Sequence, residues 1–280
     1  MFMKLSVIQM RVGHDKEENL RHAAVLVAQA AREGADMAVL PEMFVCPYEN
    51  QAFLSNGEPA GGRIWKVLSE MAERNGLYLV GGSFPEQADG RLYNSSFVFD
   101  SQGRQIARHR KVHLFDIDVE GGQYFRESDT FTAGNDITVF DTPFGRMGLC
   151  ICFDLRFPEL ARIMALEGAK VLLIPAAFNM TTGPLHWELL FRSRAIDDQV
   201  FTVGCAPARD ENGPYVSYGN SLIADPWGKI LVRAGAEEEV LMTELDLTET
   251  ERVRMQLPLM SARRTDLYQL CRGERDQSKF

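Results

Sequence analysis

The sequence predicts an α/β fold in which helices cover mixed β-sheets. Apolar segments of strand length alternate with longer segments of helical period along most of the 280 residues. Short turn sequences of the hairpin type join some neighbouring strands, so part of the sheet must be antiparallel. The alternation is irregular, and no change in composition marks a boundary. We therefore expect a single domain over residues 1–280.

The N-terminal part of the chain begins with an apolar strand at residues 4–10. Residues 15–33 place apolar side chains at helical spacing behind Asp15, a residue type that caps helices. A short buried strand is expected at 36–40, followed by an irregular stretch at 45–62 and a second helix. The irregular stretch is either a pocket wall or a plain surface connection, since loops after sheet strands commonly hold binding residues.

The middle of the chain contains a hairpin signal and a segment without period. Asp100-Ser-Gln-Gly103 separates two strand-like segments at 93–99 and 105–110, with glycine at the position that favours a left-handed conformation. Residues 112–135 are rich in Asp, Glu, Gly and Ser. A segment this long without secondary structure is usually functional or disordered, and we expect this one to shape an active site.

The second half begins with a strand that breaks at a cysteine. Met147, Leu149 and Ile151 alternate with small or polar residues, the strand breaks at Cys152, and Pro158 suits the first turn of a helix. Helices are then expected at 159–167 and 187–198, and strands at 77–82, 171–174, 200–205, 220–224, 230–232 and 240–245. The tail from about residue 248 is expected to be helical and then frayed.

Three of the expected strands each end close to a chemically capable side chain: Glu42, Lys111 and Cys152. Ligands bind outside the carboxyl ends of strands in open α/β sheets, so these residues are candidates for one site. A cysteine on a tight turn between strand and helix faces helix N–H groups that favour a thiolate nucleophile. The alternative for Cys152 alone is a small buried core residue.

Three motifs contain these residues: Leu40-Pro-Glu-Met-Phe44, Arg110-Lys-Val-His113 and Cys150-Ile-Cys-Phe-Asp-Leu-Arg-Phe-Pro-Glu159. Together they resemble the signatures of the nitrilase (carbon–nitrogen hydrolase) superfamily. The resemblance covers nearly the whole chain and implies a four-layer α-β-β-α sandwich.

The resemblance also implies catalytic roles. Cys152 is expected to be the nucleophile that forms a thioester, and Glu42 the group that carries protons. Lys111 is expected to stabilise the oxyanion together with the backbone N–H of Phe153. Glu127, in Phe125-Arg-Glu-Ser128, resembles a second glutamate of the family that helps to position the substrate.

Two further segments, 113–118 and 178–188, resemble the omega-amidase branch of this superfamily. That branch deamidates the ω-amide of short dicarboxylic monoamides such as 2-oxoglutaramate and 2-oxosuccinamate. These substrates carry a carboxylate, for which Arg156 offers a bidentate clamp; the alternative for Arg156 is a structural ion pair. Tyr48, Thr181 and Thr182 are expected to add hydroxyl donors.

Other functions stay open at this point. The main competing mechanism is a Cys–His dyad of the papain type, with His113 or His186 as its histidine. A second alternative is another amide, carbamoyl or nitrile hydrolase of the same superfamily, such as a deaminated-glutathione amidase. A third is a catalytically silent binding protein that keeps the fold, against which the complete Glu-Lys-Cys set argues.

Composition bounds the partners and the compartment. A net charge of −9 argues against a nucleic-acid or anionic-membrane partner, and no apolar run is long enough to span a bilayer. The five cysteines are scattered, without a disulfide framework or zinc spacing. We expect a cytoplasmic protein without signal peptide, metal or cofactor that acts on a small-molecule amide. The segments 159–167 and 187–198 resemble the superfamily's subunit-pairing helices, which predicts a homodimer or larger homo-oligomer.

Overall fold

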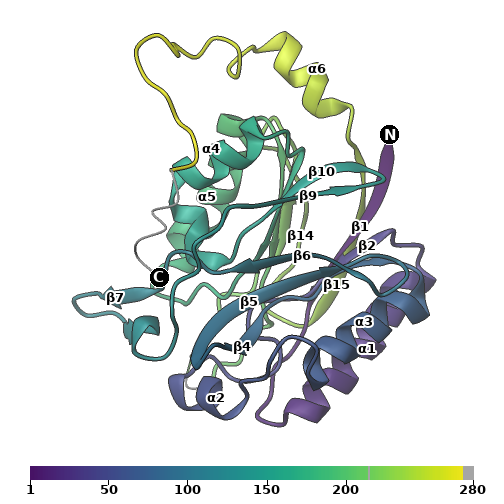
Figure 1. Ribbon diagram of the computed structural model, residues 1–280, viewed down its shortest axis with the longest axis vertical. Helices are drawn as coiled ribbons and strands as arrows, with labels where there is room; N and C mark the ends of the chain where they lie inside the picture. The colour runs from purple at the N-terminus through teal and green to yellow at the C-terminus, as the bar shows by residue number, and fades with distance from the viewer. Residues whose placement is uncertain (214, 274–280) are drawn as a thin grey trace.

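The computed structural model describes residues 1–213 and 215–273, and these form two β-sheets that lie face to face between helices (Figure 1). The space between the sheets is filled by side chains from both, among them Leu5 and Val39 from one sheet and Leu149 and Val203 from the other. Helices cover the two outer faces. The predicted four-layer α-β-β-α sandwich is therefore confirmed.

The first sheet has seven strands in the order β15-β1-β2-β3-β5-β4, with β6 paired to β5. Its strands are β1 (Phe2–Gln9), β2 (Met37–Val39), β3 (Tyr78–Val80), β4 (Phe84–Ala88), β5 (Arg91–Phe99), β6 (Gln105–Arg110) and β15 (Glu239–Asp246). β1, β2 and β3 run parallel, whereas β15, β5, β4 and β6 pair antiparallel. The sheet is mixed, as the irregular alternation predicts.

The second sheet has six strands in the order β14-β13-β12-β11-β10-β9. They are β9 (Thr138–Thr142), β10 (Gly145–Leu149), β11 (Val171–Pro175), β12 (Phe201–Cys205), β13 (Leu222–Ala224) and β14 (Ile230–Arg233). The three central strands, β10, β11 and β12, are parallel. Their carboxyl ends consequently open on one edge of the sheet, where the loop after β10 begins.

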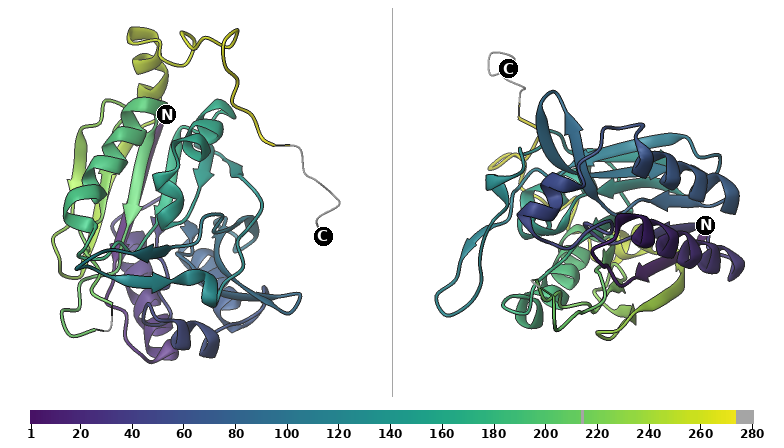
Figure 2. Two further views of the ribbon diagram at one scale, coloured as in Figure 1. Left: turned by 90° about the vertical axis from the view of Figure 1, so that its left-hand side faces the viewer. Right: turned by 90° about the horizontal axis from the view of Figure 1, so that it is seen from below.

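Helices cover the outer face of each sheet (Figure 2). α1 (Lys16–Arg32) and α3 (Arg63–Asn75) lie outside the first sheet, and α4 (Pro158–Leu166) and α5 (Gly183–Asp198) outside the second. Asp15 caps α1 as predicted, accepting a hydrogen bond of 3.0 Å from the backbone N–H of Glu18. None of the helices in the described ranges combines the length and apolar character needed to cross a membrane.

Several short elements were not predicted from the sequence. The stretch 45–62 contains a one-and-a-half-turn helix, α2 (Asn50–Ser55), that buries only Phe53, and β4 was not predicted. Within 112–135 lie the hairpin β7 (Asp116–Asp118) and β8 (Tyr124–Arg126) and the 3₁₀ helix η1 (Glu127–Asp129). Elements of three to six residues bury too few side chains to show a period.

The C-terminal part begins with a helix close to residue 248, where the sequence analysis expects one. It forms α6 (Glu249–Gln256) and then continues without regular structure to residue 273. The fraying expected at the very end concerns residues 274–280, which lie outside the described residues.

Candidate active site

Glu42, Lys111 and Cys152 come together although they belong to two different sheets. Glu42 follows β2 and Lys111 follows β6, both in the first sheet, whereas Cys152 follows β10 in the second. The site therefore lies at the carboxyl ends of strands from both sheets. All three side chains are buried, and Lys111 Nζ lies 2.9 Å from Glu42 Oε1. The predicted juxtaposition at the strand ends is present.

Cys152 sits on the strained turn between strand and helix that its sequence predicts. It has φ of +47°, a conformation that non-glycine residues rarely adopt, and it begins the 3₁₀ helix η2 (Cys152–Arg156) that leads into α4. Such a conformation persists only where neighbouring groups hold it. Here the buried carboxylate of Asp154 provides that hold.

Asp154 ties the turn to the segment that contains Lys111. Its carboxylate accepts four hydrogen bonds, from Ile151 N (3.0 Å), His113 N (2.9 Å), His113 Nδ1 (2.8 Å) and His109 Nε2 (3.0 Å). Burial opposes its charge, but the bonds from the two histidines outweigh burial and lower the pKa of Asp154. The motif around Cys152 included Asp154, yet nothing in the sequence indicated these partners.

The surroundings of the Cys152 sulfur oppose the thiolate that its position on the turn favours. Its Sγ accepts a hydrogen bond of 3.5 Å from the backbone N–H of Ala177. Burial, and secondly the carboxylate of Glu42, raise the pKa of the Cys152 thiol well above its usual range. The sequence indicated the helix start and left burial open as an alternative, but it could not show that burial and the carboxylate of Glu42 act together on the sulfur. Cys152 therefore depends on a base to become a nucleophile.

Lys111 lies between two carboxylates with no exposure to solvent. Its Nζ is 2.9 Å from Glu42 Oε1, 2.8 Å from Glu127 Oε2 and 3.4 Å from Tyr48 Oη. Burial opposes the charge, but Glu127 and Glu42 together outweigh it and raise the pKa of Lys111. The ammonium is thus charged at neutral pH. Its third N–H, which makes only the long contact to Tyr48, is free to turn toward a substrate oxygen.

The two glutamates differ in how their oxygens are occupied. Glu127 Oε2 accepts hydrogen bonds from Phe115 N (2.6 Å) and from Lys111, and Glu127 Oε1 accepts one from Asn94 Nδ2 (3.0 Å). Glu42 Oε1 is also occupied, but Glu42 Oε2 is buried and has no hydrogen-bond partner among the described residues. Glu42 therefore has an oxygen available for a proton.

The environment of Glu42 also suits a base. Burial raises the pKa of Glu42, Glu127 adds to this shift, and Lys111 opposes it without cancelling it. A carboxylate whose pKa is raised accepts protons more readily at working pH than an ordinary glutamate does. Glu42 loses its deprotonated form as pH falls through this raised pKa. Activity that needs the carboxylate is therefore lost at a higher pH than with an ordinary glutamate.

Aromatic side chains enclose the site. The ring of Tyr48 lies 4.6 Å from that of Tyr215 and 5.4 Å from that of Phe125. The hydroxyl of Tyr215 donates to the carbonyl of Ala177, whose N–H bonds Cys152. Tyr215 comes from the loop after β12. The sequence analysis did not select it as a site residue, and its aromatic side chain in a loop was the only signal for it. Tyr48 confirms that the stretch 45–62 contributes to the enclosure.

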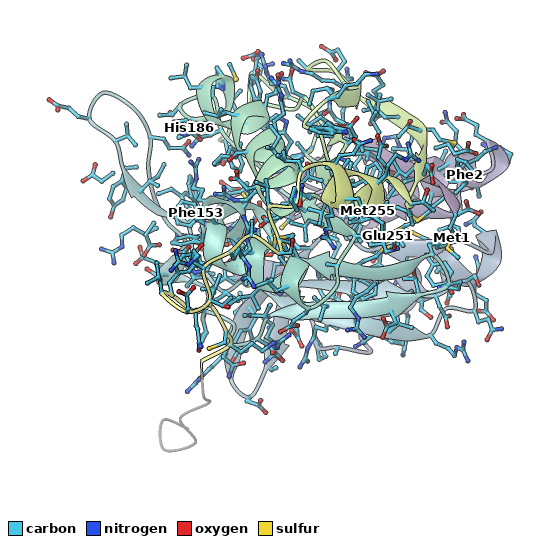
Figure 3. All side chains as sticks on the ribbon, turned by 90° about the horizontal axis from the view of Figure 1, so that it is seen from above. Met1, Phe2, Phe153, His186, Glu251 and Met255 are labelled. Carbon is cyan, nitrogen blue, oxygen red and sulfur yellow. The ribbon has the colours of Figure 1, made fainter. Side chains whose placement is uncertain are left out.

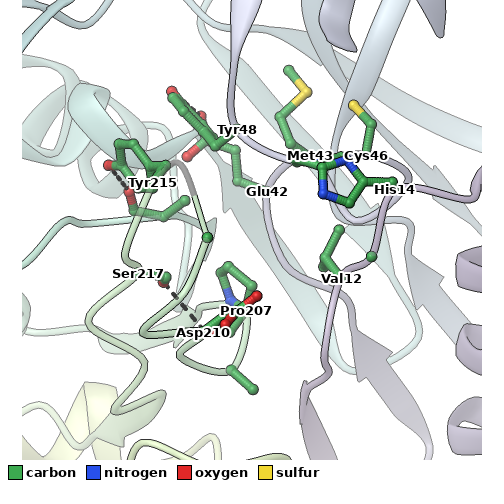
Figure 4. Close-up of a pocket in the computed structure, with 15 residues that line it drawn as sticks. Val12, His14, Glu42, Met43, Cys46, Tyr48, Pro207, Asp210, Tyr215 and Ser217 are labelled. Atoms are coloured by element: carbon green, nitrogen blue, oxygen red, sulfur yellow. Dashed lines mark hydrogen bonds between the residues drawn. The ribbon is translucent and has the colours of Figure 1, made fainter.

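A cavity of about 90 Å³ opens beside this enclosure (Figure 4). Figure 4 shows Glu42, Tyr48 and Tyr215 at its wall, with His14 on the other side. Its lining comes from segments 12–14, 42–48, 207–213 and 215–217 and from Ala177. Residues far apart in the sequence thus meet next to Glu42.

Arg156 lies half-buried beside the site without an acidic partner among the described residues. Its guanidinium is 4.7 Å from the ring of Phe178 and 5.6 Å from that of Phe153, and its Nη1 is 3.1 Å from His186 Nδ1. Figure 3 shows Phe153 and His186 on the same side of the molecule. Burial lowers the pKa of Arg156. A nearby anion, such as Cys152 as a thiolate, opposes this shift. The structural ion pair considered for Arg156 is not found in the described part.

Neither histidine considered for a Cys–His dyad serves Cys152. His113 bonds Asp154 and stacks on Phe157 with ring centres 3.6 Å apart, and His186 bonds Arg156. In residues 1–213 and 215–273 no histidine forms a hydrogen bond with Cys152. The geometry favours Glu42 over a histidine as the base.

Thr181 and Thr182 stand at the start of α5, outside this cluster. The hydroxyl and N–H of Thr182 both donate to Asn179 Oδ1, at 3.1 and 3.0 Å. Asn179 Nδ2 donates to Gln123 Oε1 at 2.6 Å, so this turn also anchors the β7–β8 hairpin. No hydrogen bond links either threonine to Glu42, Lys111 or Cys152 in the described residues. Their contact with substrate stays a prediction.

The described residues contain no group of three or more His, Cys, Asp or Glu side chains arranged to hold a metal ion. The site consists instead of a thiol, two carboxylates and an ammonium in a buried, aromatic enclosure. This combination suits acyl transfer, with a nucleophile, a proton carrier and a fixed positive charge.

Comparison with known proteins identifies the class. The family model for carbon–nitrogen hydrolases matches residues 4–255. Omega-amidase NIT2 of mouse is 46% identical over 265 residues, which cover 95% of this chain and 96% of that protein. Human omega-amidase NIT2 is 44% identical over 265 residues, with the same two coverages.

A solved structure agrees with the sequence matches. Nit3 of Saccharomyces cerevisiae, described as a member of branch 10 of the nitrilase superfamily, has a TM-score of 0.86 at 39% identity, covering 94% of this chain and 97% of its own. The fold and the site thus define an enzyme that hydrolyses carbon–nitrogen bonds. This chain belongs to the carbon–nitrogen hydrolase family, as the three motifs predicted.

Proposed function

We propose that this protein is an omega-amidase, which hydrolyses the ω-amide of short dicarboxylic monoamides such as 2-oxoglutaramate and 2-oxosuccinamate. The observation behind it is the buried cluster of Glu42, Lys111 and Cys152 beside the guanidinium of Arg156, which has no acidic partner among the described residues. Relatives named omega-amidase, 44–47% identical over 95% of the chain, support the same activity.

The first half of the reaction forms a thioester. Glu42 Oε2 takes the thiol proton as Cys152 Sγ attacks the amide carbon, so that an S–C bond forms and the carbonyl oxygen becomes an oxyanion. The ammonium of Lys111 and the backbone N–H of Phe153 stabilise that oxyanion. Glu42 then delivers its proton to the nitrogen, the C–N bond breaks, and ammonia leaves.

The second half hydrolyses the thioester. Glu42, again deprotonated, removes a proton from water as the water oxygen attacks the acyl carbon. The new oxyanion occupies the same place beside Lys111, the C–S bond breaks, and the sulfur recovers its proton from Glu42. Glu127 holds Lys111 and takes no proton, because its hydrogen bonds from Phe115 and Asn94 occupy both oxygens.

Substrate choice rests on the carboxylate at the end opposite the amide. Arg156 offers a planar fork for that carboxylate, and its buried Nε has no partner among the described residues. Tyr48 contributes a hydroxyl at the other end, where it contacts Glu42 and Lys111. Thr181 and Thr182 would contribute further hydroxyl groups.

A panel assay of ammonia release tests the proposal. 2-Oxoglutaramate and 2-oxosuccinamate should be the fastest substrates, followed by simple aliphatic amides, with nitriles and deaminated glutathione slower. Faster release from deaminated glutathione or a carbamoyl compound would instead favour the second candidate, another amidase of the superfamily. If the folded protein turned over no compound of the panel, the remaining hypothesis would be a catalytically silent binding protein.

We also propose that the chain forms a homodimer through α4 and α5. Leu185, Leu189 and Ile196 on α5 are exposed, and their spacing places them on one face, which is unusual for a helix that faces water alone. Trp227 is also exposed. A second copy that presents the same face would cover these side chains.

Light scattering at micromolar concentration should show a dimer or a larger even-numbered oligomer. Leu189→Glu should shift the equilibrium toward monomer, because it places a charge in an apolar contact. Val25→Glu, at an equally exposed position on α1, is the matched control and should leave the mass unchanged. A wild-type protein that is monomeric at this concentration would contradict the prediction.

The compartment that fits this chemistry is the cytoplasm. All five cysteines are free, including Cys152, and a thiol nucleophile needs a reducing environment to avoid oxidation. An activity that survives glutathione but is lost reversibly on mild oxidation would support this assignment.

A further inference from the structure

We propose that Asn94 is a positioning residue that separates the two glutamates of the site and keeps Glu42 ionised with Oε2 free. This inference rests on the proposed function, in which Glu42 is the base. Asn94 lies in β5, next to Ser95 and Ser96, and its side chain is fully buried.

Asn94 contacts three members of the site at once. Its Nδ2 donates to Glu42 Oε1 at 2.8 Å and to Glu127 Oε1 at 3.0 Å. Its backbone carbonyl accepts a hydrogen bond of 2.8 Å from the N–H of Lys111. One residue of β5 therefore fixes the positions of both carboxylates and of the segment that bears the ammonium.

The chemistry of the carboxamide suits this place. An NH₂ group has two hydrogens, so one nitrogen can serve two acceptors, and only this end of the amide can face two carboxylate oxygens. The other end, Asn94 Oδ1, is buried and has no hydrogen-bond partner among the described residues. A buried acceptor left unpaired costs free energy, which the two bonds to charged groups offset.

The charges around Glu42 explain why a neutral double donor is needed. Titratable side chains come from every element packed against Glu42: Lys111 after β6, Glu127 from η1, Tyr48 from the loop after β2, Cys152 from η2 and Tyr215 from the loop after β12. Only Lys111 in this group is a cation, and it is shared between two carboxylates.

Two carboxylates so close together disfavour each other's ionisation. Hydrogen bonds to the charged form counteract this effect, and Asn94 supplies one to each. It also occupies Glu42 Oε1 together with Lys111, which leaves Oε2 as the oxygen that exchanges protons. Removal of the amide should consequently shift protonation of Glu42 to higher pH.

The test compares the pH dependence of kcat/KM in Asn94→Leu, Asn94→Asp and Asn94→Ser with wild type. In Asn94→Leu the acidic limb of this pH profile should move to higher pH by about one unit, since the ionised Glu42 loses a hydrogen bond. Asn94→Asp should move it at least as far, because a third carboxylate is added. Asn94→Ser retains one hydroxyl donor and should move it less.

Ser96→Ala is the matched control. Ser96 is buried on the same face of β5, two residues further on, and its hydroxyl has no hydrogen-bond partner among the described residues. In Ser96→Ala the acidic limb of the pH profile of kcat/KM should stay at the wild-type position. Asn94 variants that lose the same fraction of activity at every pH, with the limb unmoved, would overturn the inference and reduce Asn94 to a packing role.

A second measurement separates this inference from the proposed function. The rate at which iodoacetamide alkylates Cys152 reports deprotonation of the thiol without any amide turnover. Its pH dependence should shift in the Asn94 variants as kcat/KM does. If the panel assay shows no ω-amide hydrolysis, a shifted alkylation profile still upholds the role of Asn94, and an unshifted one rejects it. Circular dichroism on Asn94→Ser, the mildest variant, verifies the fold.

Discussion

Cys152→Ala is expected to abolish hydrolysis of every amide while leaving the fold intact. The substitution removes the sulfur that forms the thioester, and no other described side chain beside Glu42 offers a comparable nucleophile. Activity should fall below about a ten-thousandth of wild type. The volume change is a single sulfur atom at the surface of an enclosed site, so thermal unfolding should change little.

Cys150→Ala provides the control for this experiment. Cys150 lies two residues before Cys152 and is also buried, but it packs in the core between the second sheet and its helices. Its loss should cost only modest activity through packing. The measurements are ammonia release and a thermal melt of both variants. Full activity in a folded Cys152→Ala protein would exclude the thioester mechanism.

How far the sequence predicts this fold is clearest at β11. Val171–Pro175 reads as a run of apolar residues, which predicts a buried strand but not what covers it. In the structure Val171 and Leu173 face the opposing sheet, whereas Leu172 and Ile174 face the helices. Both faces require apolar side chains, so periodicity alone cannot distinguish two stacked sheets from one. The four layers came from the family resemblance.

The candidate site shows a similar division. Glu42, Lys111 and Cys152 were predictable because each follows a strand, and strand ends of a sheet converge. Asn94 was not, since it lies inside β5 rather than at its end, and its partners Glu42 and Glu127 are 52 and 33 residues away in sequence. Contacts at such separation depend on sheet pairing, which local pattern does not encode.

The groups that surround Cys152 were not predictable from its own segment for the same reason. The local sequence showed a helix start, which favours a thiolate. Burial and the carboxylate of Glu42, which comes from the other sheet, act in the opposite direction and dominate. Predictions of reactivity from a single segment therefore fail where two sheets contribute to one site.

Arg156 is expected to set the preference for amides that carry a carboxylate at the opposite end. It follows Cys152 by four residues on the same turn, and its guanidinium lies over Phe178 without an acidic partner among the described residues. Guanidinium pairs bidentately with carboxylate, and a hydrogen bond to a charged group contributes about 1.5–3 kcal/mol. Its loss should lower kcat/KM by roughly ten- to a hundred-fold or more, because each 1.4 kcal/mol is about tenfold.

The measurement is a comparison of kcat/KM for wild type, Arg156→Ala and Arg156→Lys on 2-oxoglutaramate and on a simple aliphatic amide. Arg156→Ala should lose most of its activity on 2-oxoglutaramate and little on the neutral amide, which has no carboxylate to bind. Arg156→Lys should recover only part of the loss, since an ammonium cannot reproduce the planar fork or its stacking on Phe178. Equal losses on both substrates would mean that Arg156 supports the turn around Cys152 instead, and the carboxylate would then have to be bound by another residue of the enclosure.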